Sequence, residues 1–515
     1  MKFVVKILFI VLFGFCGLLS FSGVGRMQKG DHKHPQATPK TWDDEAIKTI
    51  EVPLANPSAS PVHVSSEYYY SITNEVKIYK SYPIYAPGKE PKDYWDWLKQ
   101  QEPEVIFDAA KLKTEEDWMR AGEVVFDYGP VFEGVMGPRE VRNPDWYKYT
   151  GVPLTKDGIM PFARYVVRQK GRVEVSNVAC GTCHTRVMPD GEIIKGAQGN
   201  FPFERAAAYN FRFYYEKTKD KQAFIERNRS FEMALFGAPW VKDDPNARLA
   251  KMTIEELAQT HEAIPAGVMA RHRASVFFPP QIPDLIGVKE RKYLDHTGLV
   301  RHRSIADLMR YAALTQGGDN YARFGDYLPF EPFQGKLPDP KQEERYSDDQ
   351  LYALALYLYA LQPPPNPNKF DALAARGKEI FERQKCAACH PAPLYSNNML
   401  TPVDGFKVPE EHLKQFNILP ISVGTDPNLA LKTRRGTGYY KVPSLKGLWY
   451  RGPFSHNGSV ATLEDWFDPA RLRDDYVTTG FRETGQTARA VKGHIYGLSL
   501  SEKDRQALIA FLKTL

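Results

Sequence analysis

Two copies of one five-residue pattern constrain this chain more than any other feature of its sequence. They are Cys180-Gly-Thr-Cys183-His184 and Cys386-Ala-Ala-Cys389-His390. This pattern is typical of c-type haem attachment: both cysteines bond to one porphyrin, and the following histidine binds the iron as its proximal ligand. A redox dithiol or half of a zinc site is the alternative, but zinc needs further cysteines or histidines at close spacing. The sequence therefore predicts two covalently bound haem c groups, haem 1 on the first motif and haem 2 on the second.

The first 26 residues differ in kind from the rest of the chain. Lys2 and Lys6 precede an uncharged apolar run from Ile7 to Gly25, which ends at Arg26. A positive segment followed by a hydrophobic one predicts export, and haem attachment outside the cytoplasmic membrane agrees with it. The run is long for a cleaved signal and just long enough to span a bilayer. The sequence predicts a periplasmic or exported protein, and leaves open a cleaved signal peptide or a membrane anchor.

The overall composition is that of an ordinary globular protein. Apolar residues make up 43% of the chain, and 68 basic residues against 62 acidic ones give a net charge of +6. No long basic run is present, so the sequence gives no reason to expect a nucleic-acid partner. For a chain with two haems, the expected partner is a redox protein or a small-molecule oxidant.

Three further stretches repeat in the same order around the two motifs. Gly and Phe lie four residues apart on an expected helix before each motif, at Gly122 and Phe126 and again at Gly377 and Phe381. After each motif a proline precedes a histidine by thirteen residues, in the segments Pro283–His296 and Pro443–His456. A serine-capped amphipathic helix closes each copy, over 347–361 and 501–515.

This layout of helix, motif, loop and closing helix is that of a small cytochrome c domain. The sequence therefore predicts a mainly α fold with two tandem cytochrome c domains, joined by the proline cluster Pro363–Asn368. The expected segments are 1–26 as the signal peptide or anchor, 27–104 as a tether and N-terminal extension, 105–361 with haem 1, and 369–515 with haem 2. A strand or two is expected between Glu67 and Tyr85.

The two copies differ in size. Phe126 to Cys180 spans fifty-four residues and Phe381 to Cys386 only five, and the loop after the first motif is also longer. About a hundred extra residues thus flank haem 1, which predicts that this domain is enlarged by insertions that wall a pocket. The aromatic run from Tyr209 to Tyr215 falls in the extra length, and either lines that pocket or packs in the core.

The ligand opposite each proximal histidine decides what a haem can do. An iron with two protein ligands transfers electrons, and an iron with an open position can bind dioxygen or peroxide. For haem 2 we expect His494, in Gly493-His494-Ile-Tyr-Gly497, with His456, His412 and Met399 as alternatives. For haem 1 the sequence leaves open five possibilities, which are His296, Met309, Met188, His272 and no ligand at all. No catalytic residue is assigned.

Several of these motifs resemble a known family. The segment from Val442 to Asp465, Val-Pro-Ser-Leu-Lys-Gly-Leu through Phe-Ser-His456-Asn-Gly, is similar to the C-terminal haem domain of the bacterial di-haem cytochrome c peroxidase superfamily. The Gly424-Thr-Asp-Pro427 segment and the His494 motif are closer to its rubber-oxygenase-like branch. The resemblance covers about residues 105 to 515. Peroxidases of this kind commonly carry a methionine ligand where this chain has Ala470, so the resemblance supports His494 on haem 2.

Three functions remain in view at this point. The first is an exported di-haem cytochrome in which haem 2 relays electrons and haem 1 reacts with peroxide or dioxygen. The second is a plain electron carrier or electron-transfer subunit, in which both haems have two protein ligands. The third, which the resemblance alone implies, is a dioxygenase of the rubber-oxygenase type.

Overall fold

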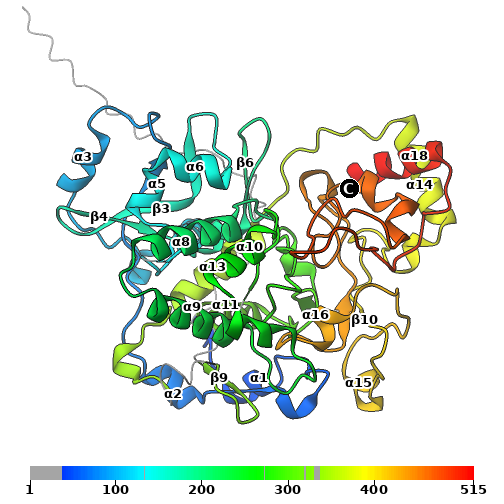
Figure 1. The fold of residues 1–515 in the computed structure, drawn as a ribbon, viewed down its shortest axis with the longest axis horizontal. Coiled ribbons are helices and arrows are strands. Elements are labelled where there is room, and N and C mark those ends of the chain that lie inside the picture. The colour runs from blue at the N-terminus through cyan, green and yellow to red at the C-terminus, as the bar shows by residue number, and fades with distance from the viewer. Residues whose placement is uncertain (1–37, 133, 272, 318–320, 330–336) are drawn as a thin grey trace, which may run out of the picture.

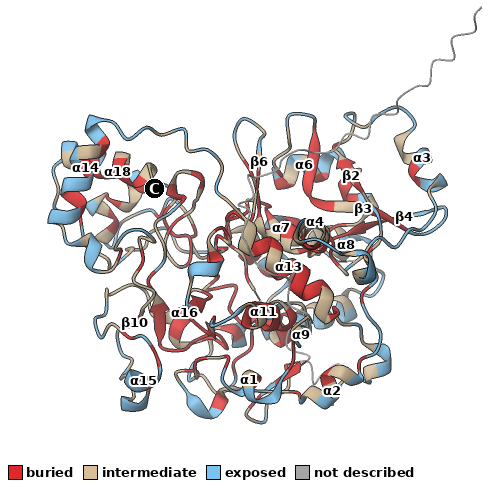
Figure 2. Ribbon diagram, turned by 180° about the vertical axis from the view of Figure 1, so that it is seen from behind, coloured by how far each residue is buried: buried red, intermediate tan, exposed pale blue. Residues whose placement is uncertain are grey.

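The structure is a computed structural model that describes residues 38–132, 134–271, 273–317, 321–329 and 337–515. The leader expected at 1–26 lies outside these residues. Figure 1 shows the C-terminal part of the chain, with helices α14 (Ala372–Arg383) and α18 (Glu502–Lys513), on one side of the molecule. The elements up to α13 (Asp348–Ala360) fill the other side. Buried residues lie in both parts (Figure 2), and those of α14 and α18 form an apolar cluster separate from that of α13 and α4 (Glu115–Asp127).

Two helix pairs are built in the same way. Helix α4 packs on α13, and α14 packs on α18. Where they cross, Gly122 lies against the Ala353 carbonyl and Gly377 against the Ala507 carbonyl, so neither glycine leaves space for a Cβ atom. The two closing helices begin at serine caps, as the sequence predicted, with the hydroxyls of Ser347 and Ser501 accepting from main-chain N–H groups.

The enlarged first part contains three further long helices. Their bounds are α8 (Phe203–Lys217), α9 (Lys221–Phe236) and α10 (Ile254–Glu262), and α11 (Ile305–Gly317) follows them. Side-chain caps start two of these helices, Asp220 before α9 and Thr253 before α10. The extra length that follows the first motif therefore contributes helices α8, α9 and α10.

Helices predominate, but the described residues also hold five small sheets. The largest is antiparallel, in the order β2 (Ser81–Tyr85), β3 (Ile159–Gln169) and β4 (Arg172–Ser176). The other pairs are β1 (Pro61–His63) with β9 (Ala322–Phe324), β5 (Thr185–Val187) with β6 (Ile193–Lys195), β7 (Tyr293–Leu294) with β8 (Val300–Arg301), and β10 (Leu400–Pro402) with β11 (Tyr439–Lys441). The mainly α prediction thus holds only in part. Strand β2 lies in the stretch where a strand was expected.

The described residues of the N-terminal extension pack into the core. Trp42, Ile50 and Leu54 are at most 2% exposed and belong to the same apolar core as α13. The Trp42 ring stacks on Tyr69 with 4.4 Å between ring centres. The polar composition hid these spaced apolar residues, whose burial ties the extension to the core that contains α13.

The glycine contacts lead to a test of the helix pairs. A Cβ atom on Gly377 would lie 1.9 Å from the Ala507 carbonyl oxygen, so α14 and α18 would have to separate. We expect Gly377→Ala to lower the free energy of unfolding by about 1–3 kcal/mol or more, measured by denaturant titration. Lys378→Ala, on the exposed side of the same helix, should change it by less than about 0.5 kcal/mol. Equal values for both variants would show that the close crossing is not important for stability.

Candidate functional site

The second Cys-x-x-Cys-His motif lies at the end of α14. Cys386 to Ala388 form a 3₁₀ turn, and the motif cysteines form no disulfide. The His390 ring is buried and its Nδ1 hydrogen-bonds to the Tyr395 carbonyl at 3.0 Å. Burial lowers the pKa of His390, against the opposing effect of the Tyr395 and Pro443 main chains. The imidazole is therefore neutral, with Nε2 as the nitrogen that can bind a metal.

His494 faces His390. The two ring centres are 6.5 Å apart with an interplanar angle of 60°. Two imidazoles that bind one metal through bonds of about 2 Å have ring centres about 6 Å apart, so the gap fits a metal between them. The His494 Nδ1 is buried without a hydrogen-bond partner, and burial and His390 lower its pKa to about 4.

The main chain around His494 is held firmly. Its N–H donates to the Val423 carbonyl at 2.6 Å, and the buried Arg471 donates to the His494 carbonyl at 2.9 Å. Gly493 packs against Gly424 so closely that a Cβ atom would lie 2.3 Å from the Gly424 main chain. The two glycine-containing motifs singled out in the sequence thus meet in space and present the His494 ring.

The other candidates for haem 2 have different neighbours. His456 stacks on Tyr440, with ring centres 4.5 Å apart. The His412 Nδ1 contacts the Tyr439 hydroxyl at 3.0 Å. The main chain of Met399 is bonded to the Asn397 side chain and to the Val442 N–H.

The first motif forms the short helix α7 (Cys180–His184). The Thr182 hydroxyl donates to the Phe162 carbonyl at 2.8 Å, which fixes α7 on strand β3. Burial and the nearby Arg271 lower the pKa of His184 to about 3, and the Pro283 main chain opposes this. The His184 Nδ1 is buried without a hydrogen bond of good geometry. Like His390, His184 is a neutral imidazole backed by the proline of its own repeat.

A cavity of about 150 Å³ lies against this motif. Three separate parts of the chain form its wall. The N-terminal extension supplies Glu51, the second repeat supplies Arg435, and the first repeat supplies the rest. The first-repeat residues are Val178–Cys180, Cys183, His184, Met269, Arg271, Arg273, Ile282, Pro283, Leu299, Val300, Tyr311 and Leu314–Gln316.

The wall of this cavity is charged. Arg271 donates to the Tyr311 hydroxyl at 3.1 Å and to the Thr315 hydroxyl at 3.3 Å. The Tyr311 hydroxyl in turn donates to Asp295 at 3.3 Å, and Asp295 is ion-paired with Arg435. These contacts join Arg271 to the second repeat through a continuous polar chain.

A second ion pair lies in the same wall. Arg273 contacts Glu51 at 2.9 Å, and His63 contacts the same carboxylate at 3.2 Å. Burial raises the pKa of Glu51, but His63 and Arg273 outweigh it and lower the pKa to about 2. Glu51 is therefore ionised, and the N-terminal extension is electrostatically part of this site.

The described candidates for the distal ligand of haem 1 do not line this cavity. Met309 is fully buried in the apolar core, and Met188 packs in a separate cluster. His296 lines another pocket, and its Nε2 donates to the Gln281 carbonyl at 2.7 Å. His272 lies outside the described residues.

The sequence analysis missed Met269, Arg271 and Arg273, which lie beside the candidate His272 in the sequence. The Met269 sulfur lies 3.4 Å from the Cys183 sulfur, and Arg271 and Arg273 both reach the cavity. The alternation of one methionine and two arginines over five residues was the available signal. The aromatic run Tyr209–Tyr215 does not line the cavity and packs with neighbouring helices instead, for example as Tyr209 against Tyr149.

Comparisons with known proteins find similar sequences over part of the chain. No protein-family model matches the chain. "Cytochrome-c peroxidase IdrP1" of Denitromonas iodatirespirans is 28% identical over 28% of this chain and 40% of its own length. "Methylamine utilization protein MauG" of Methylorubrum extorquens is 29% identical over 28% of this chain and 34% of its own length. "Cytochrome-c peroxidase IdrP2" of Denitromonas iodatirespirans is 31% identical over 27% of this chain and 38% of its own length. The matched region thus spans 40% or less of each of these relatives.

Over the matched region, the chain is similar to members of the bacterial di-haem cytochrome c peroxidase superfamily. Its cofactors are two covalently bound haem c groups. Among solved structures, a xenon-pressurised hydrazine synthase of Kuenenia stuttgartiensis matches with 16% identity and a TM-score of 0.29. The match covers 60% of this chain and 92% of the hydrazine synthase chain. A MauG-like protein associated with microbial copper homeostasis matches with 16% identity and a TM-score of 0.28. This match covers 46% of this chain and 73% of the MauG-like chain. TM-scores this low say nothing about the arrangement of this di-haem chain.

A buried charged network holds the Met269–Arg273 segment in place. Glu204 on α8 accepts from the Ala270 N–H at 2.7 Å and contacts the His261 Nδ1. Glu232 on α9 contacts the His261 Nε2 at 3.1 Å. Both carboxylates and the imidazole are at most 5% exposed. The inserted helices α8, α9 and α10 therefore position the segment that carries Met269 and Arg271 into the cavity.

This network predicts an alkaline loss of stability. Burial lowers the pKa of His261, but Glu232 and Glu204 outweigh it and raise the pKa to about 10, from 6.5 when unperturbed. A raised pKa stabilises the fold fully below pH 6.5, and the stabilisation is lost as the pH rises through about 10. The unfolding free energy should fall by a few kcal/mol between about pH 7 and 10, and by less in His261→Gln. His412→Gln should keep the wild-type pH profile, and an unchanged profile in His261→Gln would contradict the assignment.

Proposed function

We propose that this chain is an exported di-haem cytochrome that transfers electrons between a closed haem 2 and an open haem 1, and that haem 1 reacts with peroxide. One contrast supports this function. His494 stands 6.5 Å from His390 in the second site, whereas a cavity of about 150 Å³ lies against His184 in the first. A plain electron carrier would need an opposing ligand at both sites.

In this proposal each motif holds one haem. Haem 1 is attached to Cys180 and Cys183 with His184 as the proximal ligand. Haem 2 is attached to Cys386 and Cys389, with His390 as the proximal and His494 as the distal ligand. When bound, the haems supply electron transfer, and an iron with an open position also supplies peroxide or dioxygen binding.

The residues around the first site favour peroxide over a hydrocarbon. The Arg271 guanidinium is held by Tyr311 and Thr315, with its charge beside the motif cysteines and His184. A fixed cation in an enclosed site stabilises negative charge that develops there. A polyisoprene-like chain would instead have to cover the charged groups of Glu51, Arg271 and Arg435, which costs free energy.

Export and a redox partner are part of the proposal. The sequence of the leader supports export, and no helix in the described ranges is long and apolar enough to cross a membrane. The partner would be a redox protein or a small-molecule oxidant, and the balanced surface charge gives no reason to expect a nucleic acid.

Carbon monoxide binding to the reduced protein tests this function directly. Two haems should resist acid–acetone extraction, because each is held by two thioethers. The wild type should bind one carbon monoxide per two haems. The variant His494→Ala should bind two molecules of carbon monoxide per two haems, because the substitution opens haem 2. The control variant His412→Ala should bind one, like the wild type.

Removing the first motif locates the reactive iron. Cys180→Ala with Cys183→Ala should leave one haem that binds no carbon monoxide and does not react with peroxide. If the wild type bound no carbon monoxide, the plain electron carrier would be the better description. If the remaining haem kept the reactivity, the roles of the two sites would be reversed.

A further inference from the structure

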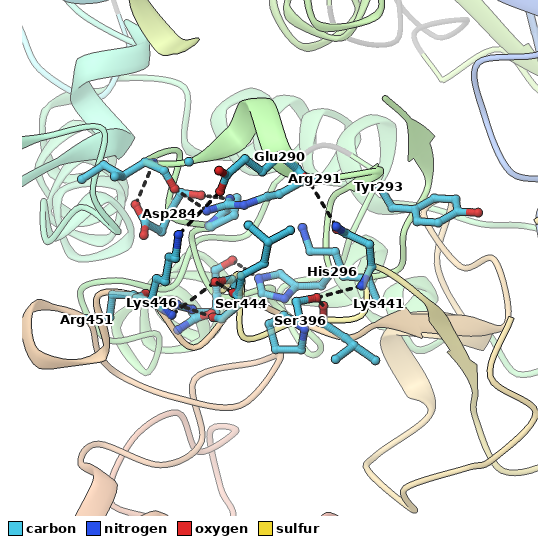
Figure 3. Close-up of a pocket in the computed structure, with 18 residues that line it drawn as sticks. Asp284, Glu290, Arg291, Tyr293, His296, Ser396, Lys441, Ser444, Lys446 and Arg451 are labelled. Atoms are coloured by element: carbon cyan, nitrogen blue, oxygen red, sulfur yellow. Dashed lines mark hydrogen bonds and ion pairs between the residues drawn. The ribbon is translucent and has the colours of Figure 1, made fainter. Parts of the chain in front are cut away.

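A second, smaller pocket lies between the two repeats. Its volume is about 50 Å³, and residues from both proline segments line it (Figure 3). Pro283 and Pro443, whose main chains flank His184 and His390, are both part of its wall. The pocket therefore lies between the two haem sites, and Pro283 also lines the cavity at the first motif.

Two equivalent arginines enter this pocket from equivalent turns. Gly287 and Gly447 both adopt left-handed conformations, with φ of 74° and 73°, and a 3₁₀ turn follows each. Arg291 donates to the carbonyls of Asp284 and Ile286, and Arg451 donates to those of Ser444 and Lys446. Main-chain carbonyls satisfy these N–H groups but do not neutralise either charge. The Arg451 Nε is buried and has no acceptor.

Lys441 adds a third cation to the pocket. Its main-chain N–H donates to the His296 carbonyl at 2.9 Å, which fixes the residue at the wall. Burial lowers the pKa of Lys441 well below its usual value, and the charges of Arg291 and Arg451 lower it further. His296 beside it is neutral, since burial and Lys441 lower its pKa to about 3.

The acidic groups in the wall do not balance these cations. Four basic residues, Arg291, Lys441, Lys446 and Arg451, face two acidic ones, Asp284 and Glu290. Glu290 lies 3.7 Å from Lys446 with both half exposed, so this pair neutralises itself at the rim. Asp284 hydrogen-bonds to the Tyr450 hydroxyl at 3.1 Å, and burial raises its pKa. An excess of two positive charges remains, and buried cations without an anion are costly.

We propose that this pocket, with Lys441, Arg291 and Arg451, binds carboxylate groups of the haem propionates. The inference rests on the haem attachment proposed above, but not on the reactivity of haem 1. The pocket accommodates one or two carboxylates and is far too small for a porphyrin. Pro283 and Pro443 connect this pocket to both motif histidines, because their main chains contact His184 and His390. Two carboxylates would match the excess charge.

Bound in this way, the cations also act on the irons. A positive charge near a haem disfavours the ferric state, which carries the larger charge, and so raises its midpoint potential. Lys441, which carries a full charge once a carboxylate is beside it, would therefore tune the potential of one or both haems.

The test measures midpoint potentials of the holoprotein by spectroelectrochemistry. Lys441→Met and Lys441→Gln should each lower the midpoint potential of at least one haem by about 59 mV. This shift corresponds to a tenfold change in the equilibrium constant of a one-electron reduction. Lys441→Arg should keep the potentials near those of the wild type. Lys378→Met, which removes an exposed charge from α14, is the matched control and should cause no comparable shift.

Two results would overturn the inference. The first is equal potentials in the wild type and both uncharged Lys441 variants. The second is a wild-type potential that depends on inorganic phosphate at constant ionic strength, with the dependence lost in Lys441→Met, because the pocket would then bind a free anion. Both variants should keep two haems and one carbon monoxide site. Failure of carbon monoxide binding in the wild type would reject the proposed function and leave this inference standing.

Discussion

An exchange of main-chain hydrogen bonds between the two repeats determines the rest of the arrangement. The Gln281 N–H donates to the His456 carbonyl at 2.8 Å, and the Lys441 N–H donates to the His296 carbonyl at 2.9 Å. Gln281 and Lys441 each lie two residues before the repeated proline, so each repeat closes the loop of the other. The histidines thirteen residues after the prolines therefore join the two halves. This contact fixes both Cys-x-x-Cys-His motifs relative to one another and encloses the cationic pocket between them.

Within this near-symmetric frame the two sites differ in what lies opposite the motif histidine. In the second repeat, Gly424 and Gly493 meet so closely that the main chain presents His494 to His390. In the first repeat, the inserted helices hold Met269–Arg273 through the Glu204–His261–Glu232 network, and a cavity remains against His184. Glu51 and Arg435 complete its wall, so the N-terminal extension and the second repeat must both fold before the first site is whole.

Much of this could be predicted from local sequence patterns, and the remainder depends on distant contacts. The two motifs, the serine-capped closing helices and the glycine-containing crossing helices each follow from residues within one turn or segment. The cavity does not, because Glu51, Met269 and Arg435 converge from positions hundreds of residues apart. The pairs β1 with β9 and β10 with β11 could not be predicted because each joins segments far apart in the sequence. The pairs β3 with β4, β5 with β6 and β7 with β8 are local, and their strands were not singled out from the sequence. The packed extension was missed because its apolar residues are spaced among polar ones.

The central claim is that one haem site is closed by a second histidine and the other is open. The electron paramagnetic resonance spectrum of the oxidised protein tests it most directly, because low-spin and high-spin ferric haems give separate signals. The account predicts one low-spin signal of a bis-histidine haem and one high-spin signal, in equal amounts. Two low-spin signals with no high-spin component would contradict it.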